Sequence, residues 1–333
     1  MSRCQTVVPV TESSQVGEAR RAAVQLAERA GLGEADRGKV AIVATELANN
    51  LVRHARGGEM LLKAVGGGVE VVSVDRGPGM ADVAACLRDG FSTGGTPGTG
   101  LGAVRRLSTA FDVHSVQPSG TVVLSRVAAA SPAAPARLKF DWSVVCVPVR
   151  GETACGDTWR VATSEDGDGK LSLMLADGLG HGPLASDAAE AAGAAFDAEP
   201  FAAPRAVIET AHGRMHGTRG GAVAVARVDG GALRYAGVGN ISGSVVTPSG
   251  SQGLVSHNGT AGVQVRKVQE FDYAFPPDGM LVMHSDGLQT RWSLDGYPGL
   301  ALRRPAVVAA LLYRDFSRGR DDLTVAVVRP VRD

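Results

Sequence analysis

Apolar positions in the first part of the chain follow first the period of a helix and then that of a strand. Over 14–30 and 37–54 they recur every three or four residues, which predicts two amphipathic helices. Ser13 or Ser14 is expected to cap the first helix, and Gly31 to end it. Shorter runs predict a helix at 103–107 and strands at 60–65, 69–75, 111–116 and 121–127.

The second part of the chain has a different order of elements. The pattern predicts strands, then helices, then strands again, which indicates an α+β sandwich. The expected strands are 140–149, 159–163, 171–176, 221–228, 232–236, 244–247, 263–271, 280–284 and 324–328. The expected helices are 184–196, 204–216 and 305–313.

An Ala/Pro segment separates the two patterns. Residues 129–138 contain two prolines among alanines, which discourages a continuous helix and is typical of a linker. We therefore predict a first domain at 1–128 and a second at 139–333. A length of 333 residues agrees with two domains.

Composition narrows the functional classes. A hydrophobic content of 44% with 20% charged residues is that of a folded protein. The formal net charge of zero argues against a general nucleic-acid surface. We expect a cytoplasmic protein without membrane insertion, because there is no secretory pattern and no apolar run of about 18 residues. The four cysteines form no Cys-x-x-Cys pair, and Cys155 is interpreted as a small, partly buried residue.

Acidic residues stand at the edges of strands in the second domain. Asp177 ends an apolar run and opens the glycine-rich stretch Asp177–Gly182. Asp157, Asp286 and the pair Asp321-Asp322 lie in comparable places. Four such sites predict one centre with two metal ions, because carboxylates are the ligands of hard divalent cations.

The order Gly-Asp, Asp-Gly-x-Gly-His-Gly, Ser-Asp-Gly and Asp-Asp-x-Thr resembles the metal-dependent PPM (PP2C-like) protein phosphatases, in particular their SpoIIE/RsbX branch, over about 140–329. The resemblance implies a β-sandwich flanked by helices and two Mn²⁺ or Mg²⁺ ions. It makes Asp177 the bridging and catalytic ligand, and the motif favours Asp321 over its neighbour Asp322. The implied metal ligands are Asp157, Asp177, the Gly178 carbonyl, Asp286 and Asp321.

The histidines leave alternatives open. His181 could be a ligand or an acid, or it could hydrogen-bond the backbone and fix its turn. His212 and His216 lie four residues apart on a predicted helix. We interpret them as a solvated helix face, because the sequence offers no third zinc ligand. The loops 237–240 and 258–262 are interpreted as structural.

Two glycine loops and a polar helical pair carry the chemistry of the first domain. Glu46 and Asn50, four residues apart, project together beside the apolar stripe of their helix. Asp75-x-Gly77-x-Gly79 and Gly98-Thr99-Gly100-Leu101-Gly102 follow, and the second loop opens a helix. A helix beginning at a glycine loop presents backbone N–H groups to phosphate.

The ordered set resembles the N, G1 and G2 boxes of the GHKL (Bergerat) ATP-binding α/β sandwich over about 5–127. Together with 89–107, it looks most like the small kinase RsbT and its anti-sigma relatives. The resemblance implies that Asp75 accepts the adenine amino group, Gly77 and Gly79 shape the base pocket, and Asn50 holds Mg²⁺. Glu46 would be the general base, and the phosphates of ATP would be wrapped by Gly98, Thr99, Gly100, Leu101 and Gly102.

Three functional hypotheses follow. The first is a bifunctional protein serine/threonine kinase and phosphatase, whose partners in resembling systems are STAS-domain regulators of partner-switching, stressosome-like pathways. In the second, the phosphatase stays and the first domain is a nucleotide-dependent, anti-sigma-like binding or regulatory module. In the third, both domains are inactive scaffolds, which the intact acidic positions make the weakest hypothesis.

Overall fold

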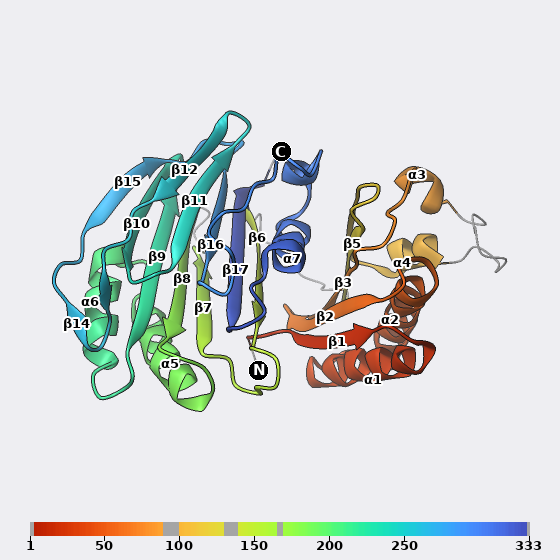
Figure 1. Ribbon diagram of the computed structural model, residues 1–333, viewed down its shortest axis with the longest axis horizontal. Coiled ribbons are helices and arrows are strands. Elements are labelled where there is room, and N and C mark those ends of the chain that lie inside the picture. The colour runs from red at the N-terminus through yellow and green to blue at the C-terminus, as the bar shows by residue number, and fades with distance from the viewer. Residues whose placement is uncertain (1–2, 89–99, 130–138, 165–168, 332–333) are drawn as a thin grey trace. The chain divides into compact units, whose positions relative to one another are not determined.

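A five-stranded antiparallel sheet organises the first part of the chain (Figure 1). The computed structural model describes residues 3–88, 100–129, 139–164 and 169–331. The order of the strands in this sheet is β1-β2-β3-β5-β4. Their bounds are β1 Thr6–Val10, β2 Gly58–Val65, β3 Gly68–Val74, β4 Ala110–Ser115 and β5 Thr121–Ala128.

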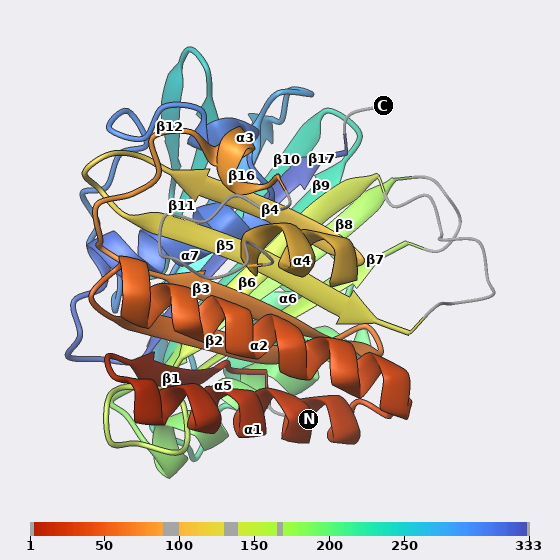
Figure 2. The same ribbon diagram turned by 90° about the vertical axis from the view of Figure 1, so that its right-hand side faces the viewer.

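Helices cover one face of this sheet. Figure 2 shows α1 and α2 lying side by side across it. Buried alanines of α1 at intervals of four residues pack with the apolar stripe of α2 and the inward-facing valines of the strands. The helices are α1 Ser13–Arg29, α2 Glu34–His54, the short α3 Val83–Cys86 and α4 Gly100–Leu107.

The predicted cap of α1 is wrong. The N-cap residue is Glu12, and the Gln15 side chain reaches back to accept the Glu12 backbone N–H at 3.1 Å. The Ser14 hydroxyl instead donates to the Glu12 carboxylate. Gly31 follows the helix with a φ of +75°, as expected for the residue after a C-cap.

Two further five-stranded sheets and two helices form the second part of the chain. One sheet has the order β15-β10-β9-β8-β7 and the other the order β12-β11-β16-β17-β6. The bounds of the first are β7 Asp157–Thr163, β8 Lys170–Gly178, β9 Gly221–Asp229, β10 Ala232–Val238 and β15 Glu270–Ala274. Those of the second are β6 Phe140–Val147, β11 Ser242–Thr247, β12 Gly250–Leu254, β16 Met280–His284 and β17 Leu323–Pro330.

Side chains join these layers. Trp142 of β6 meets Trp159 of β7 edge to face, with ring centroids 5.9 Å apart, which connects the two sheets. The helices α5 (Pro183–Ala198) and α6 (Pro204–Arg214) pack their buried alanines and aliphatic residues against β8, β9 and β10. The predicted strand 263–271 is wrong, since only β14 (Gln264–Val265), paired with β13 (Gly259–Thr260), and the start of β15 lie in it.

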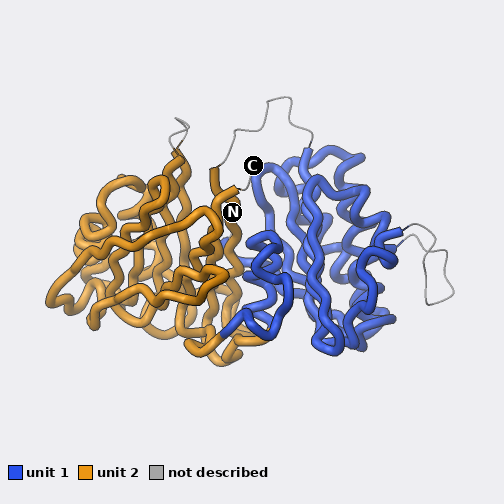
Figure 3. Tube along the Cα trace, turned by 90° about the horizontal axis from the view of Figure 1, so that it is seen from above, with its two compact units in different colours: residues 1–133, 293–314 blue, residues 134–292, 315–333 orange. Residues whose placement is uncertain are grey.

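The chain divides into two compact units (Figure 3). Unit 1 contains residues 1–133 together with 293–314, and unit 2 contains 134–292 with 315–333. The segment 293–314 holds the 3-10 turn Leu300–Leu302 and most of α7 (Pro305–Phe316). The predicted domain ranges 1–128 and 139–333 stay a prediction, and nearly all of the predicted linker 129–138 lies outside the described residues.

Hydrogen bonds seat the segment 293–314 within unit 1. The Tyr313 hydroxyl donates to Glu59 Oε2 at 2.8 Å, and the Arg314 guanidinium donates to the Asp75 carbonyl at 2.7 Å. The Arg304 backbone N–H donates to Asp112 Oδ2 at 2.6 Å. Later residues of the chain thus complete the fold of the unit that begins it.

Candidate functional site

Strand pairing in unit 2 puts two of the predicted ligands side by side. Asp157 begins β7 and is the direct register partner of Asp177, near the end of β8. Residues directly opposite in an antiparallel pair have Cβ atoms about 4.5–5.5 Å apart on the same face of the sheet. The two carboxylates therefore share one end of the β7–β8 ladder.

The other candidate carboxylates are close enough to act on Asp177. Burial first, and then the charges of Asp286, Asp321 and Asp322, raise the Asp177 pKa to about 8. Burial and the neighbouring charge of Asp321 raise the pKa of Asp286. The structure thus gathers residues from β7, β8, the end of β16 and the start of β17 into one acidic cluster.

The two carboxylate oxygens of Asp157 differ in their contacts. Its Oδ2 accepts a 2.7 Å hydrogen bond from the Ser285 hydroxyl, which itself accepts the Thr324 backbone N–H at 2.9 Å. Its Oδ1 is buried and accepts no hydrogen bond of ordinary geometry among the described residues, although the Thr324 hydroxyl lies close enough to the Asp157 carboxyl group to lower its pKa slightly. Burial and the charge of Asp177 raise the pKa of Asp157 well above its usual range. A buried carboxylate oxygen without such a bond is a fitting ligand atom for a hard divalent cation.

Asp321 and Asp322 have different environments. Asp322 is buried, and its two oxygens accept the backbone N–H groups of Val149 at 2.7 Å and Gly156 at 2.8 Å. Asp322 therefore fixes the loop between β6 and β7. Asp321 is exposed, and its Oδ1 accepts the Asp322 backbone N–H at 2.9 Å. This arrangement supports Asp321 as the ligand candidate.

Gly156 and Gly178 have no side chain, which lets the backbone around Asp157 and Asp177 approach Asp322 and the start of α5 closely. A Cβ on Gly156 would lie 2.8 Å from Asp322 Oδ2 and 2.9 Å from the Ala185 side chain. A Cβ on Gly178 would lie 2.0 Å from the Ala185 carbonyl oxygen, so the first turn of α5 packs directly on the end of β8. Glycine at both positions is a packing requirement of the site.

Sequence reasoning missed Asn240, and the loop 237–240 was interpreted as structural only. The Asn240 side-chain amide donates a 2.7 Å hydrogen bond to Asp286 Oδ2 and so orients a candidate ligand. The polar residue in Gly-Val-Gly-Asn after a buried strand was the available signal. Ser285 was quoted only as part of a motif, and its bond to Asp157 was not expected.

The histidines make specific contacts. His181 pairs through Nδ1 with Glu152 Oε1 at 2.9 Å, so its hydrogen bond goes to a carboxylate rather than to the backbone. The solvated-face interpretation of His212 and His216 holds only in part, since His216 is exposed and His212 half-buried, but both rings also contact Gly262. His212 Nδ1 accepts the Gly262 backbone N–H at 2.8 Å, and His216 Nδ1 lies 2.9 Å from the Gly262 carbonyl oxygen. Both rings therefore hold the loop before β14.

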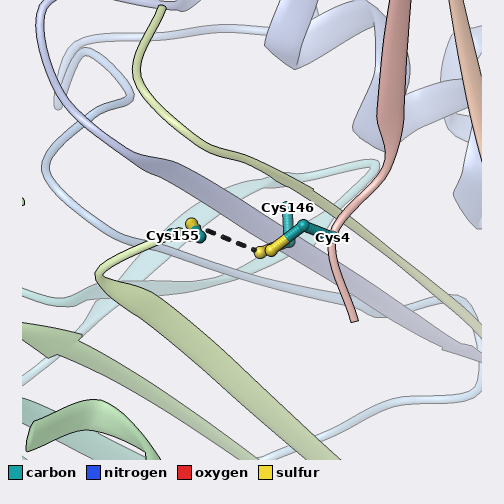
Figure 4. Close-up of side chains that lie close together, drawn as sticks. All are labelled: Cys4, Cys146 and Cys155. Carbon is teal, nitrogen blue, oxygen red and sulfur yellow. Dashed lines mark hydrogen bonds between the residues drawn. The ribbon is translucent and has the colours of Figure 1, made fainter. Parts of the chain in front are cut away.

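Two cysteines lie beside the acidic cluster. Figure 4 shows Cys146 of β6 and Cys155, two residues before Asp157, with their side chains close together. Their sulfur atoms are 3.7 Å apart. Both are buried, and they form no disulfide with each other. The position of Cys155 agrees with a small packed residue, here buried with 8% of its surface exposed.

In unit 1, α2 and α4 bring the predicted polar pair to the glycine loop. A Cβ on Gly100 would lie 3.7 Å from Glu46 Oε2 and 3.9 Å from Asn50 Oδ1, so both side chains face the start of α4. Gly100, Leu101 and Gly102 form the first turn of that helix. The predicted phosphate-binding residues Gly98 and Thr99 lie outside the described residues.

Asp75 follows β3 and holds a tight turn. Its Oδ1 accepts the backbone N–H groups of Gly77 at 2.8 Å and Thr121 at 3.2 Å. Burial raises the Asp75 pKa, and the two N–H groups and the Arg314 charge oppose that rise. A Cβ on Gly77 would lie 2.7 Å from Ala55 Cα, and Gly79 has a φ of +70°. The predicted base-pocket residues thus form one turn fixed by Asp75.

Among the described residues, no helix combines the length and the apolarity needed to cross a membrane.

Sequence families match the two parts of the chain separately. The histidine kinase-like ATPase domain family matches residues 9–126, and the stage II sporulation protein E (SpoIIE) family matches residues 167–330. The serine/threonine-protein kinase RsbT of Bacillus subtilis (strain 168) is 31% identical over 123 residues. The match covers 36% of this chain and 92% of RsbT.

Solved structures are similar as well. One comes from work on the bacterial stressosome as a modular system adapted to control secondary messenger signaling. It has a TM-score of 0.52 and 27% identity, over 57% of this chain and all of that chain. RsbX in complex with magnesium has a TM-score of 0.50 and 20% identity, over 58% of this chain and 96% of RsbX, which supports the fold alone.

Proposed function

We propose that this chain is a bifunctional protein serine/threonine kinase and metal-dependent phosphoserine/phosphothreonine phosphatase. Its first part belongs to the RsbT family of histidine kinase-like ATPase domains, and its second part is a SpoIIE, PP2C-type phosphatase domain. Both resemblances found in the sequence are confirmed, and so is the α+β class with two different domains.

The proposed phosphatase site is the acidic cluster of unit 2. The observation that carries it is the buried Oδ1 of Asp157, which accepts no ordinary hydrogen bond from the described residues, directly across the ladder from an Asp177 whose pKa is raised to about 8. Asp157, Asp177, the Gly178 carbonyl, Asp286 and Asp321 would hold two Mn²⁺ or Mg²⁺ ions. The bound ions supply an activated water and neutralise charge on the transferred phosphoryl group.

Protein groups outside the ligand set support this site. The Ser285 hydroxyl holds Oδ2 of Asp157 by a hydrogen bond, which leaves Oδ1 available to a metal ion. The Asn240 amide holds Oδ2 of Asp286 in the same way. Asp322 holds the loop that carries Gly156. Such hydrogen bonds orient ligands before an ion arrives and are expected to raise its affinity.

The proposed kinase site is the turn fixed by Asp75 together with the facing ends of α2 and α4. ATP would place its adenine at Asp75 and its phosphates at 98–102, with Mg²⁺ at Asn50. Glu46 would orient the protein hydroxyl and accept its proton. Phosphoryl transfer asks the protein for positioning and electrostatic stabilisation, which this arrangement can supply. The closeness of Glu46 and Asn50 to Gly100 supports the proposal.

The proposed partners are STAS-domain proteins of a stressosome-like partner-switching pathway. The 27% identical chain from the stressosome work supports this proposal, as does the RsbT relative. A kinase and a phosphatase on one chain would set the phosphorylation level of one partner from both directions.

The deciding experiment uses the full chain with Asp177→Asn, so that the phosphatase cannot erase the product. It is incubated with γ-labelled ATP, Mg²⁺ and STAS-domain proteins encoded beside its gene. We expect label on a serine or threonine of the partner, and its removal by the unsubstituted protein with Mn²⁺. Glu46→Gln in the same background should lower labelling about 10²–10⁴-fold while ATP binding survives.

Other results would change the proposal. ATP binding without labelling would favour the nucleotide-dependent binding or regulatory module for the first domain, and the phosphatase would remain. Failure of the unsubstituted protein to remove the label would contradict the phosphatase. A Glu46→Gln protein that labels at the normal rate would remove that residue from the general-base role.

A further inference from the structure

Arg219 lies in a turn that is tied to the metal-site loop. The Thr218 hydroxyl oxygen accepts the Gly220 backbone N–H at 3.0 Å and so shapes the turn. The Gly220 carbonyl accepts the Leu179 backbone N–H at 2.9 Å, and Gly221 is the register partner of Gly178. The position of Arg219 is therefore set by the same residues that follow Asp177 along the chain.

The guanidinium of Arg219 lies over that loop. Its Nη1 is 3.1 Å from the point at which a Cβ on Gly180 would stand. Gly180 has a φ of +87°, and its carbonyl oxygen is 3.1 Å from the corresponding point on Gly156. Gly180 thus lies between Arg219 and the residue before Asp157, and its missing side chain leaves the space that the guanidinium fills.

Arg219 is exposed, and its charge has no hydrogen bond or ion pair with any other described residue. Arg160 by contrast is paired with Glu190 and Asp197, and Arg205 with Glu209. Arg318 already acts on the cluster, since its charge lowers the pKa of Asp286. Arg219 therefore keeps its donors available beside the loop that follows Asp177.

We propose that Arg219 binds the phosphoryl group of the phosphoserine or phosphothreonine substrate at the edge of the metal site. The inference rests on the proposed phosphatase function. A guanidinium presents several N–H donors in a planar fork that matches phosphate oxygens, and such charge-assisted hydrogen bonds are strong. Metal ions at Asp177 would hold the phosphate from one side, and Arg219 would hold it from the rim.

The test compares the full chain with Arg219→Ala, Arg219→Lys and Arg214→Ala. Arg214 is the matched control, because it is also exposed and lies at the end of α6, five residues away. The probe is inorganic phosphate, titrated calorimetrically into protein saturated with Mn²⁺. We expect Arg219→Ala to weaken phosphate binding about tenfold or more, and Arg219→Lys to restore part of the loss. Arg214→Ala should bind phosphate normally, and all variants should bind Mn²⁺ with unchanged affinity.

Hydrolysis of para-nitrophenyl phosphate provides the second measurement. We expect Arg219→Ala to raise KM more than it lowers kcat, because the lost contact exists before the reaction. Phosphate binding that depends on Arg219 in a protein that hydrolyses no phosphoester would retain the inference and reject the proposed function. If Arg219→Ala binds phosphate normally and hydrolyses the ester with a normal KM, the role of Arg219 is rejected and the phosphatase function is retained. An unsubstituted Mn²⁺-saturated protein that binds no phosphate would overturn the inference.

Discussion

Asp157 stands directly opposite Asp177 in the antiparallel register of β7 and β8. Like charges directly opposite each other across two strands destabilise a sheet. Asp157 is buried and Asp177 is half-buried, and in both the pKa of the carboxyl group is raised. Repulsion between the two carboxylates therefore destabilises this strand pair. Protonation removes the repulsion at low pH, and a bound divalent cation would offset it at high pH.

Stability without metal should fall as the pH rises. The Asp177 pKa of about 8 lies above its unfolded value, so this carboxyl contributes stability that is fully present below the unfolded pKa and is lost as the pH rises through about 8. We expect the melting temperature of unit 2 in EDTA to fall between pH 6 and pH 9, and Mn²⁺ to release protons below pH 8. Calorimetry in buffers of different ionisation enthalpy measures those protons.

The control for this prediction is Asp177→Asn, which keeps the shape of the side chain and does not titrate. Its melting temperature in EDTA should depend less on pH than that of the unsubstituted protein. Equal pH dependence of the two proteins would show that Asp177 is not the group responsible.

Ser285→Ala should weaken both the fold and the metal site. The hydroxyl bridges Asp157 Oδ2 and the Thr324 N–H in the interior, so its loss leaves buried polar atoms unpaired. We expect the free energy of unfolding to fall by about 1–3 kcal/mol, and Mn²⁺ affinity to fall about 10–100-fold. Denaturant unfolding and calorimetry measure these two quantities.

Ser172→Ala is the matched control, because the Ser172 hydroxyl is also buried but has no hydrogen-bond partner among the described residues. Its removal should leave stability unchanged or raised. Equal losses of Mn²⁺ affinity in the two variants would show that the Ser285 bond to Asp157 has no special role.

Asn240→Ala should lower Mn²⁺ affinity about tenfold, since Asp286 loses the amide that orients its Oδ2. Asn258→Ala is the control, an exposed asparagine in a neighbouring loop. Calorimetric titration with Mn²⁺ distinguishes the two variants. An Asn240→Ala protein with normal affinity would restore the original interpretation of the loop 237–240 as structural.

The segment 293–314 should loosen in mild acid. Burial is the main cause that lowers the pKa of His114, whose Nε2 lies 3.2 Å from the Pro298 carbonyl oxygen. The Asp112 carboxylate opposes this shift, while Arg303 and Arg314 add to it. A histidine with a depressed folded pKa contributes stability that is present above its ordinary value of about 6.5 and is lost as the pH falls through the folded value.

We therefore expect the unfolding transition of unit 1 to lose more stability between pH 7.5 and pH 5 in the unsubstituted protein than in His114→Gln. His54→Gln, at the exposed end of α2, should behave like the unsubstituted protein. Identical pH dependence in all three proteins would exclude His114 as the titrating group.

The spacing of apolar residues over short stretches of the sequence predicted most helices and strands of the fold. The amphipathic stripe of α2 and the apolar runs ending at Asp177 and Asp286 are local features, and the structure places them as expected. The strands β1 and β12 were missed because neither has a clear alternation. β1 contains Pro9, and β12 is the glycine-containing, largely exposed run Gly250–Leu254 at a sheet edge.

Contacts between distant residues could not be predicted from such patterns. Ser285 bonds a residue 128 positions away, and Asn240 bonds one 46 positions away. Neither side chain has a local signature, because serine and asparagine are common beside strands and turns for other reasons. The choice between Asp321 and Asp322 likewise depended on which of them the Val149 and Gly156 amides face.

Residues 293–314 belong to unit 1 although they stand between Asp286 and Asp321 in the sequence. A single cut near the Ala/Pro segment would therefore separate 293–314 from the rest of unit 1, although the SpoIIE family match runs unbroken over 167–330. The N-terminal fragment would lack Tyr313 and Arg314, the partners of Glu59 and of the Asp75 carbonyl. The two compact units alternate along the chain, with boundaries after residues 133, 292 and 314, so exchanging one whole unit for that of another gene requires three junctions.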